Sequence, residues 1–303
     1  GPLSAVTQYG KQAIGNASYV YFAGGGGGNL VDRVDYSNDT ATALAKGPLS
    51  TPSFERGGAV GDGSYGYFAG GIRPSPSTTV DRIDYSNDTA TASPKGPLTS
   101  AIGYGRGMGA RECGLPQTNT APTPAIAAPV QPPFPYPQQL PAPAPAHGYY
   151  VSGDDNATPN PATTKIGRID FSNDTATTVL KGNMHTGRRR HTSFANQTHG
   201  YTGGGNNPGA GVSPSYFSSI ERMTFANDTA TSVDKSTFRE AFTQVPSPGQ
   251  GASSAVSIGA PAYGYWQAGN ATFIDRIDYA NDTAQASAKT NSTISSNSRS
   301  AVS

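Results

Sequence analysis

Cysteine, charge and long apolar stretches are all scarce in this chain of 303 residues. Cys113 is the only cysteine, which excludes a framework of disulfide bonds within the chain. Charged residues make up 14% of the sequence and the formal net charge is +1, so no bulk attraction to nucleic acid or to an anionic membrane is expected. No apolar run approaches the roughly 20 residues of a membrane-spanning helix. We therefore expect no nucleic-acid partner and no membrane span.

Motifs for catalysis or for binding metals and nucleotides are missing as well. The glycine run at residues 24–28 lacks a surrounding βαβ pattern, so it does not indicate a nucleotide loop. The group of Asp32, Asp35, Asn38 and Asp39 has neither the spacing nor the central glycine of an EF-hand. No zinc-type spacing accompanies the four histidines, which are His147, His185, His191 and His199. We expect no cofactor, no metal and no enzymatic activity.

One phrase is present in five copies. It reads Asp-Arg-Ile-Asp-Tyr-Ser-Asn-Asp-Thr-Ala-Thr in its second copy, and the copies occupy residues 32–42, 81–91, 167–177, 221–231 and 275–285. Repetition at such a period is typical of a repeat architecture. Each unit is too small to bury its own apolar face, so the units must stack on one another.

The second copy shows the strand pattern of one unit. Residues 64–71 are an aromatic run that ends in two glycines, and residues 79–85 alternate in the manner of a strand. Residues 86–88 predict a turn, and residues 89–92 predict the return strand because threonine is β-branched. Proline then interrupts the pairing at residues 95–97. With the strand that precedes the aromatic run, each unit forms a meander of four antiparallel strands.

Alternation along the third strand assigns its side chains to two faces. Ile83 and Tyr85 share one face, and Arg82 and Asp84 share the other. We expect the first face to be buried between units, at Val34, Ile83, Ile169, Met223 and Ile277 and at Tyr36, Tyr85, Phe171, Phe225 and Tyr279. The arginine recurs in every unit and the acid two positions later in four of them, with Thr224 as the exception. This predicts a structural ion-pair ladder at Arg33, Arg82, Arg168, Arg222 and Arg276.

The run Tyr-Gly-Tyr-Phe-Ala-Gly-Gly followed by Asp-Arg-Ile-Asp-Tyr-Ser-Asn-Asp-Thr-Ala resembles kelch-like repeats, although the kelch tryptophan of the fourth strand is absent. More narrowly, it resembles repeats in virion or tail-fibre-like proteins of tailed phages. Four strands per unit and a glycine pair after the second are typical of a propeller blade, with the glycines near the central axis. The fold class is therefore all-β: a kelch-like β-propeller of four-stranded antiparallel blades.

The aromatic–glycine motif also occurs five times, so we expect five blades in a single domain covering residues 1–303. The repeats are placed at about 1–46, 47–95, 96–181, 182–235 and 236–289, with a terminal strand segment at 290–303. Residues 1–4 copy residues 47–50, and the tail from Lys289 is in the same phase. This spare segment could remain unused, begin a sixth blade, or pair with another subunit.

A proline-rich insertion at residues 113–146 interrupts the third repeat between its first and second strands. Its proline runs favour an extended polyproline conformation that cannot enter a sheet interior. Two interpretations remain open: a disordered surface loop, or an arm that docks on a neighbour through Phe134 and Tyr136.

Arg188, Arg189 and Arg190 form the only basic run. It predicts either a solvated turn or a contact with a partner, such as an anionic glycan or phosphate.

Each Asn-Asp-Thr of the repeated phrase is an N-glycosylation acceptor sequence, at Asn38, Asn87, Asn173, Asn227 and Asn281. We expect these asparagines at equivalent exposed hairpin turns between the third and fourth strands. In a secreted eukaryotic protein they would carry sugar, whereas in a phage or a bacterial cytosol the pattern would have no such meaning.

These observations favour a non-enzymatic structural and interaction protein of a virion appendage or an extracellular filament, acting in assembly or attachment. Its expected partners are copies of itself or neighbouring structural subunits, and its expected location is the virion or the extracellular space. The alternative is a secreted, N-glycosylated, carbohydrate-binding or adhesive propeller on a cell surface, with a glycan as partner. A propeller enzyme is a third hypothesis, which the sequence supports least because no catalytic set stands out.

Overall fold

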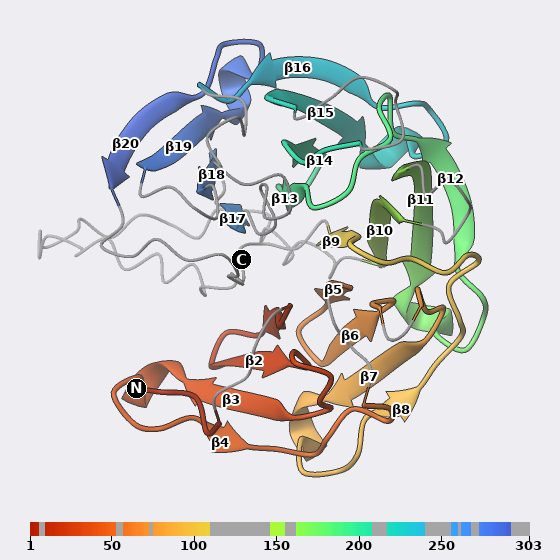
Figure 1. Cartoon of the computed structure of the whole chain (residues 1–303), viewed down its shortest axis with the longest axis vertical. Helices are drawn as coiled ribbons and strands as arrows, with labels where there is room; N and C mark the ends of the chain where they lie inside the picture. The colour runs from red at the N-terminus through yellow and green to blue at the C-terminus, as the bar shows by residue number, and fades with distance from the viewer. Residues whose placement is uncertain are drawn as a thin grey trace, which may run out of the picture.

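The protein is a five-bladed β-propeller in which each blade is one four-stranded antiparallel sheet (Figure 1). A computed structural model describes residues 1–5, 10–52, 57–72, 75–109, 146–154, 162–207, 217–239, 256–259, 262–267 and 273–291. The all-β propeller of four-stranded antiparallel blades and the count of five blades, both predicted from the repeats, are confirmed.

Every blade has the same order of elements, with a single turn of 3₁₀ helix (η) between its third and fourth strands. Blade 1 contains β1 (Gln12–Gly15), β2 (Tyr19–Ala23), β3 (Val31–Asp35), η1 (Tyr36–Asn38) and β4 (Leu44–Ala45). Blade 2 contains β5 (Gly58–Gly61), β6 (Tyr65–Ala69), β7 (Val80–Asp84), η2 (Tyr85–Asn87) and β8 (Ser93–Pro94). Blade 3 contains β9 (Arg106–Gly109), β10 (His147–Asp154), β11 (Ala162–Asp170), η3 (Phe171–Asn173) and β12 (Val179–Asn183). Blade 4 contains β13 (Thr192–Ala195), β14 (His199–Gly203), β15 (Ser219–Thr224), η4 (Phe225–Asn227) and β16 (Val233–Thr237). Blade 5 contains β17 (Val256–Gly259), β18 (Tyr263–Gln267), β19 (Phe273–Asp278), η5 (Tyr279–Asn281) and β20 (Ser287–Asn291).

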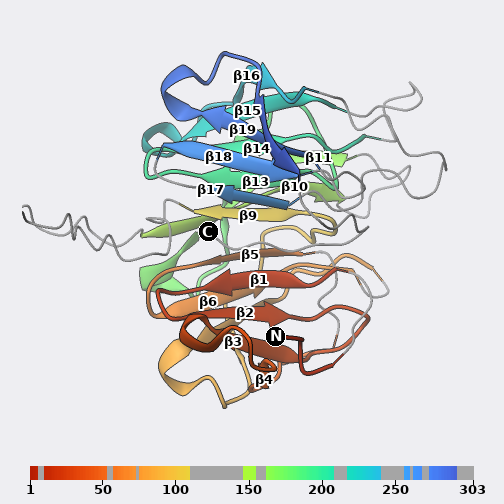
Figure 2. The same cartoon turned by 90° about the vertical axis from the view of Figure 1, so that its left-hand side faces the viewer.

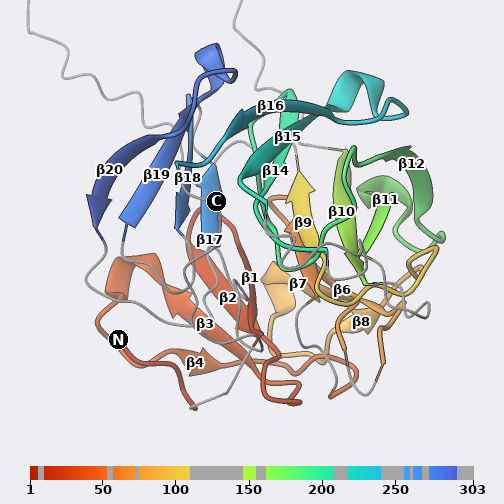
Figure 3. The ribbon, with the colours of Figure 1, turned by 45° about the horizontal axis from the view of Figure 1, so that its top comes forward.

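The first strand of each blade lies closest to the centre, where β1 packs on β5, β5 on β9, β9 on β13 and β13 on β17. In Figure 2 these five strands lie in the middle of the molecule. The later strands lie progressively farther out, as β12, β16 and β20 show in Figure 3. Small residues permit this close approach of the inner strands. A Cβ added at Gly107 of β9 would lie 2.2 Å from the carbonyl oxygen of Ala59 on β5, too close for any side chain.

The glycine pair that follows the second strand permits a close backbone approach and also turns the chain. A Cβ added at Gly70 would lie 2.6 Å from the carbonyl oxygen of Ile102, so this position has no room for a side chain, as predicted. The approach of blade to blade at the centre, however, is made by the first strands. Gly70 and Gly71 have φ angles of 68° and 103°, which an L-residue with a side chain rarely adopts. The pair therefore allows the chain to turn out of the second strand.

The turn before the fourth strand also differs from the prediction. The predicted simple hairpin turn at residues 86–88 is part of a 3₁₀ turn, and the backbone N–H of Ala90 donates to the carbonyl of Asn87 at 3.3 Å. Turn and bend geometry therefore extends to residue 90 of the predicted return strand at residues 89–92, residues 91 and 92 belong to no strand, and β8 begins only at Ser93. A local hydrogen bond outweighs the strand preference of the two threonines in this stretch.

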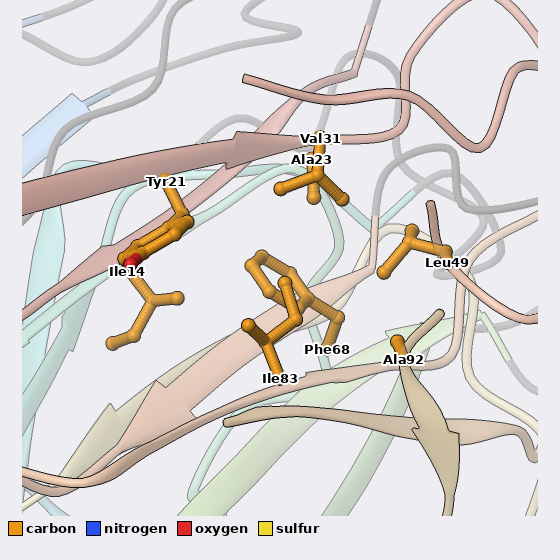
Figure 4. Packing of buried hydrophobic residues seen from close by; sticks show 8 residues of the cluster. All are labelled: Ile14, Tyr21, Ala23, Val31, Leu49, Phe68, Ile83 and Ala92. Atoms are coloured by element: carbon orange, nitrogen blue, oxygen red, sulfur yellow. The ribbon is translucent and has the colours of Figure 1, made fainter. Parts of the chain in front are cut away.

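Four apolar clusters make up the described core, and each lies between two consecutive blades. Figure 4 shows the cluster between blades 1 and 2, where Ile14, Tyr21 and Val31 of blade 1 face Phe68 and Ile83 of blade 2. A single blade thus buries its apolar face only against its neighbour, as the stacking argument requires.

The predicted core face is confirmed in blades 2 to 5 for its aliphatic members, because Ile83, Ile169, Met223 and Ile277 are all at most 4% exposed. The aromatic residues two positions later are only half-buried, namely Tyr85, Phe171, Phe225 and Tyr279. Blade 1 departs further from the prediction: Val34 is half-buried and Tyr36 is 40% exposed. In the described residues, no blade packs on that face of blade 1.

The predicted repeat boundaries differ slightly from the sheets. Strands β12, β16 and β20 each continue two residues beyond the expected ends at 181, 235 and 289. The proline-rich insertion falls between β9 and β10, as predicted, but residues 110–145 lie outside the described part of the chain. That range includes Phe134 and Tyr136, so their predicted contacts stay predictions.

Candidate functional site: the contacts between blades

An arginine of the third strand joins each of the first four blades to the next one. Its guanidinium Nη1 lies 2.7–2.9 Å from a carboxylate of the following blade, in the pairs Arg33–Asp88, Arg82–Asp174, Arg168–Asp228 and Arg222–Asp282. The predicted ladder therefore exists at four of the five arginines, and it runs between blades.

The acids of this ladder are not the predicted ones. Asp84, two residues after Arg82, instead accepts from the backbone N–H of Ser86 and caps η2. Asp35, Asp170 and Asp278 cap their 3₁₀ turns in the same way, whereas Thr224 in blade 4 makes no such bond. The ladder acid is the aspartate of the Asn-Asp pair, which sequence reasoning assigned to a turn. Its role depends on blade stacking, which strand alternation does not reveal.

Three donor groups of the preceding blade surround each ladder aspartate: a tyrosine hydroxyl and an arginine within hydrogen-bond distance, and a lysine ammonium at 3.1–3.9 Å. At Asp88, one carboxylate oxygen accepts from the hydroxyl of Tyr21 at 2.9 Å and from Arg33 at 2.7 Å, and the other oxygen lies 3.1 Å from the Lys46 ammonium. Burial alone would raise the pKa of Asp88, but the hydrogen bonds from Tyr21, Lys46 and Arg33 hold it below its ordinary value of 3.8. The carboxylate is thus kept charged by its neighbours.

An aromatic pair accompanies every ladder aspartate. The tyrosine that donates to the aspartate stacks on the aromatic residue that begins the next blade's 3₁₀ turn, with ring centroids 5.0–5.2 Å apart. The pairs are Tyr21–Tyr85, Tyr67–Phe171, Tyr149–Phe225 and Tyr201–Tyr279. Offset stacking of this kind adds to the stabilisation from burial. We call the aspartate, its three donors and the stacked pair the blade junction.

The chain between two blades is fixed by a second acid. Asp81 is fully buried and accepts from the backbone N–H and the hydroxyl of Ser50, both at 2.7 Å. Nearby, the backbone N–H of Ala92 donates to the carbonyl of Pro48. Residues 1–4 repeat this contact on blade 1, where Ala43 donates to Pro2 and Ser4 bonds to Asp32. The N-terminal copy of the connector is therefore used within its own blade.

In blade 4 the residue equivalent to Asp81 is Glu221. Its carboxylate binds Arg188, the first residue of the predicted basic run. Glu221 and Arg188 are both fully buried and form a salt bridge. The guanidinium also donates to the carbonyls of Gly204 and Ser219 at 3.0 Å. Arg188 is therefore not on the surface, which overturns both its predicted contact with a partner and the predicted solvated turn at this residue. The longer glutamate was the only sequence signal for this pair.

Arg189 and Arg190 remain partly exposed beside Tyr104. Arg189 pairs with Asp154 at 2.9 Å, and the Arg190 guanidinium lies 5.0 Å from the centre of the Tyr104 ring. Tyr104 and Arg190 have positive φ angles of 55° and 58°, a strained backbone that is common at functional sites. Of the three arginines of the basic run, Arg189 and Arg190 are the two with side chains partly exposed to solvent.

The five predicted acceptor asparagines occupy equivalent positions at the ends of η1 to η5, and all five are exposed. The turn type differs from the predicted hairpin, as described above, but the exposure agrees. Each Oδ1 lies 3.3–3.5 Å from the hydroxyl of the following threonine.

Within the described ranges, no group of three or more histidine, cysteine, aspartate or glutamate side chains is arranged to hold a metal ion. In the same part of the chain, no helix has the length and apolarity that a membrane-spanning helix requires. The chain matches no protein-family model and no curated protein sequence.

The blade junctions predict an acid-sensitive stability. A carboxylate whose pKa is lower in the folded state contributes stability that is complete above its ordinary pKa and is lost as the pH falls through the folded value. For Asp88 this loss should begin near its ordinary value of 3.8 and continue below it. We expect the variant Asp88→Asn to lose less stability than the wild type over this range, as measured by urea unfolding at a series of pH values.

Asp81 provides a control, because its pKa is shifted in the opposite direction from that of Asp88. Burial raises its pKa above 3.8, although the bonds from Ser50 oppose the shift, so its protonation on acidification favours the folded state. The variant Asp81→Asn should therefore lose stability more steeply with acid than the wild type. If the free energy of unfolding fell equally steeply with pH in both variants, the opposite pKa shifts of Asp88 and Asp81 would be contradicted.

Proposed function

We propose that this protein is a non-enzymatic structural and interaction protein that acts in assembly or attachment. The observation that carries the proposal is the use of the repeated charged residues. The arginines and aspartates of four successive repeats join blade to blade, and four further aspartates cap turns. Repeated groups used in this way build a scaffold, whereas an enzyme concentrates its distinctive groups at one site.

The setting that we propose is a virion appendage or an extracellular filament. The support is the sequence resemblance of the aromatic–glycine run and the Asp-Arg-Ile-Asp-Tyr phrase to kelch-like repeats, and more narrowly to those of tailed-phage virion proteins. Propeller folds serve many functions, so the fold alone does not select among them.

Negative-stain electron microscopy of the purified full chain, together with sedimentation velocity, tests this proposal. The expected result is a regular particle or fibre larger than one chain of 31.1 kDa, alone or with neighbouring structural subunits. The structural role would be contradicted if the protein stayed monomeric at every concentration and also formed no larger particle with other subunits of its native assembly.

A second candidate function is supported by the five exposed asparagines. Their equivalent places would present one sugar per blade in a secreted, N-glycosylated propeller that binds carbohydrate or adheres to a cell surface. Intact mass after expression in a eukaryotic secretory pathway tests it. This candidate predicts a mass well above 31.1 kDa that falls stepwise with Asn→Gln variants at these positions, whereas an unmodified mass would contradict it.

A further inference from the structure

We propose that blade 5 of one molecule packs on blade 1 of a second copy through the same blade junction that joins consecutive blades within the chain. This inference deepens the proposed assembly role by naming the partner and the two surfaces. Both halves of a fifth junction are present in the chain, and within its described residues they are not joined to each other.

Blade 5 carries the donor half. Tyr265, Arg276 and Lys289 occupy the positions of Tyr21, Arg33 and Lys46. The Arg276 guanidinium lies 4.1 Å from the centre of the Tyr263 ring, as Arg33 lies 4.2 Å from that of Tyr19. Arg276 is thus held in the same pose as the arginines that reach an aspartate. Among the described residues, however, no carboxylate pairs with it.

The exposure of this face agrees with a missing neighbour. Tyr265 is half-buried, whereas Tyr21, Tyr67, Tyr149 and Tyr201 are at most 3% exposed. Ile274 is also half-buried, whereas Ile166 and Ile220 at its position are fully buried. Blade 5 therefore leaves apolar surface and hydrogen-bond donors uncovered on one side.

Blade 1 carries the acceptor half. Asp39 is exposed, whereas Asp88, Asp174, Asp228 and Asp282 at its position are each 7% exposed. Tyr36, which would provide the second ring of the stacked pair, is 40% exposed. Phe22 and Val34 are half-buried, whereas the equivalent Phe68 and Ile83 are at most 4% exposed. Asp39 and Arg276 thus provide complementary charges on complementary faces.

A second copy suits these surfaces better than the chain's own blades. Figure 1 shows blade 5 and blade 1 standing apart, and no packing comparable to that of the other inner strands joins β17 to β1 in the described ranges. The connector position of blade 1 is already filled by residues 1–4, so a partner blade need not be covalently continuous with it. In the connector that follows blade 5, Ser292 replaces the apolar residue found at Leu49, Leu98, Met184 and Phe238.

The contact is heterologous, because a donor face meets an acceptor face. Repetition of such a contact gives a ring if its rotation closes and a fibre if it does not. The opposite charges at its centre also limit the contact to one orientation, since two donor faces or two acceptor faces would repel each other.

Charge reversal on each face tests the proposal, with sedimentation velocity over a range of concentrations as the measurement. We expect the wild type to sediment as species larger than one chain as concentration rises, and both Arg276→Glu and Asp39→Arg to remain monomeric. An equimolar mixture of the two variants should recover association, because each altered face then meets its complement. The control Asp234→Arg alters an exposed carboxylate on β16 and should associate as the wild type does.

The alternative is closure within one chain. In that case the wild type stays monomeric and each single variant is less stable to heat. Mixing the two variants restores no stability, and only a double variant with both substitutions in one chain regains it. That pattern would overturn the proposal, as would association that neither variant weakens. In the latter case the assembly role would stand and only the surface assigned here would be wrong.

Discussion

Replacement of Glu221 by alanine is expected to destabilise the folded protein by about 3–5 kcal/mol. The substitution leaves the Arg188 guanidinium uncompensated in the interior, where burial already opposes its charge and lowers its pKa. It also removes the acceptor of the backbone N–H groups of His185 and Thr186 and of the Ser232 hydroxyl. Loss of one partner from a buried ion pair is far more costly than loss of an exposed pair. Urea unfolding at neutral pH measures the difference.

Two further variants make this result specific. Asp234→Ala removes an exposed carboxylate from β16 of the same blade and should change stability by no more than about 0.5 kcal/mol. Adding Arg188→Met to Glu221→Ala removes the stranded charge and should restore part of the loss, because the two effects are coupled. A cost below about 1 kcal/mol for Glu221→Ala would show that water reaches this pair.

Trp266→Ala should also cost about 3–5 kcal/mol, the range for removal of a large aromatic side chain from a packed core. Trp266 is 2% exposed and stacks on Phe238 with ring centroids 3.9 Å apart, at the contact between blades 4 and 5. The cavity would lie between two blades, inside a cluster that also contains Phe194, Tyr201 and Phe238. Denaturant unfolding followed by far-ultraviolet circular dichroism measures the loss without relying on the tryptophan signal.

Phe22→Ala is the matched control, because Phe22 has the position in blade 1 that Trp266 has in blade 5. No described blade covers it, and it is only half-buried. Since hydrophobic stabilisation scales with the area removed from water, its cost in dilute protein should be roughly half that of Trp266→Ala or less. Equal costs would mean that another part of the molecule covers blade 1.

The repeats in the sequence were sufficient to predict the fold. Five copies of the Asp-Arg-Ile-Asp-Tyr phrase gave the blade count, and alternation placed Ile83 and its equivalents in the core. Exposure of the Asn-Asp turns was also predictable, because Asn and Asp favour turns whatever the neighbouring blade does. These features depend on local chemistry within one repeat.

The contacts between blades were harder to predict. Arg82 meets Asp174, 92 residues away, and nothing in the strand pattern indicates which residue of the next blade lies opposite. Three adjacent arginines are typical of a surface, so burial of Arg188 could be recognised only once Glu221 was known to face it. The different burial of Val34 and Ile83 likewise follows from their places in the ring, because the two residues occupy the same position in the repeat.

The central claim is that an arginine–aspartate ion pair joins neighbouring blades at four junctions within the chain. At the fifth junction, between Arg276 and Asp39, the pair is not formed within one chain. Double-mutant cycles at two equivalent positions test it most directly, in protein dilute enough to be monomeric. Alanine substitution of Arg82 and Asp174 should give a coupling energy of about 0.5–3 kcal/mol, and the same substitutions at Arg276 and Asp39 should couple by less than about 0.3 kcal/mol. Equal coupling at both positions would show a ring closed within one chain, and no coupling at Arg82 and Asp174 would show that the ladder does not join the blades.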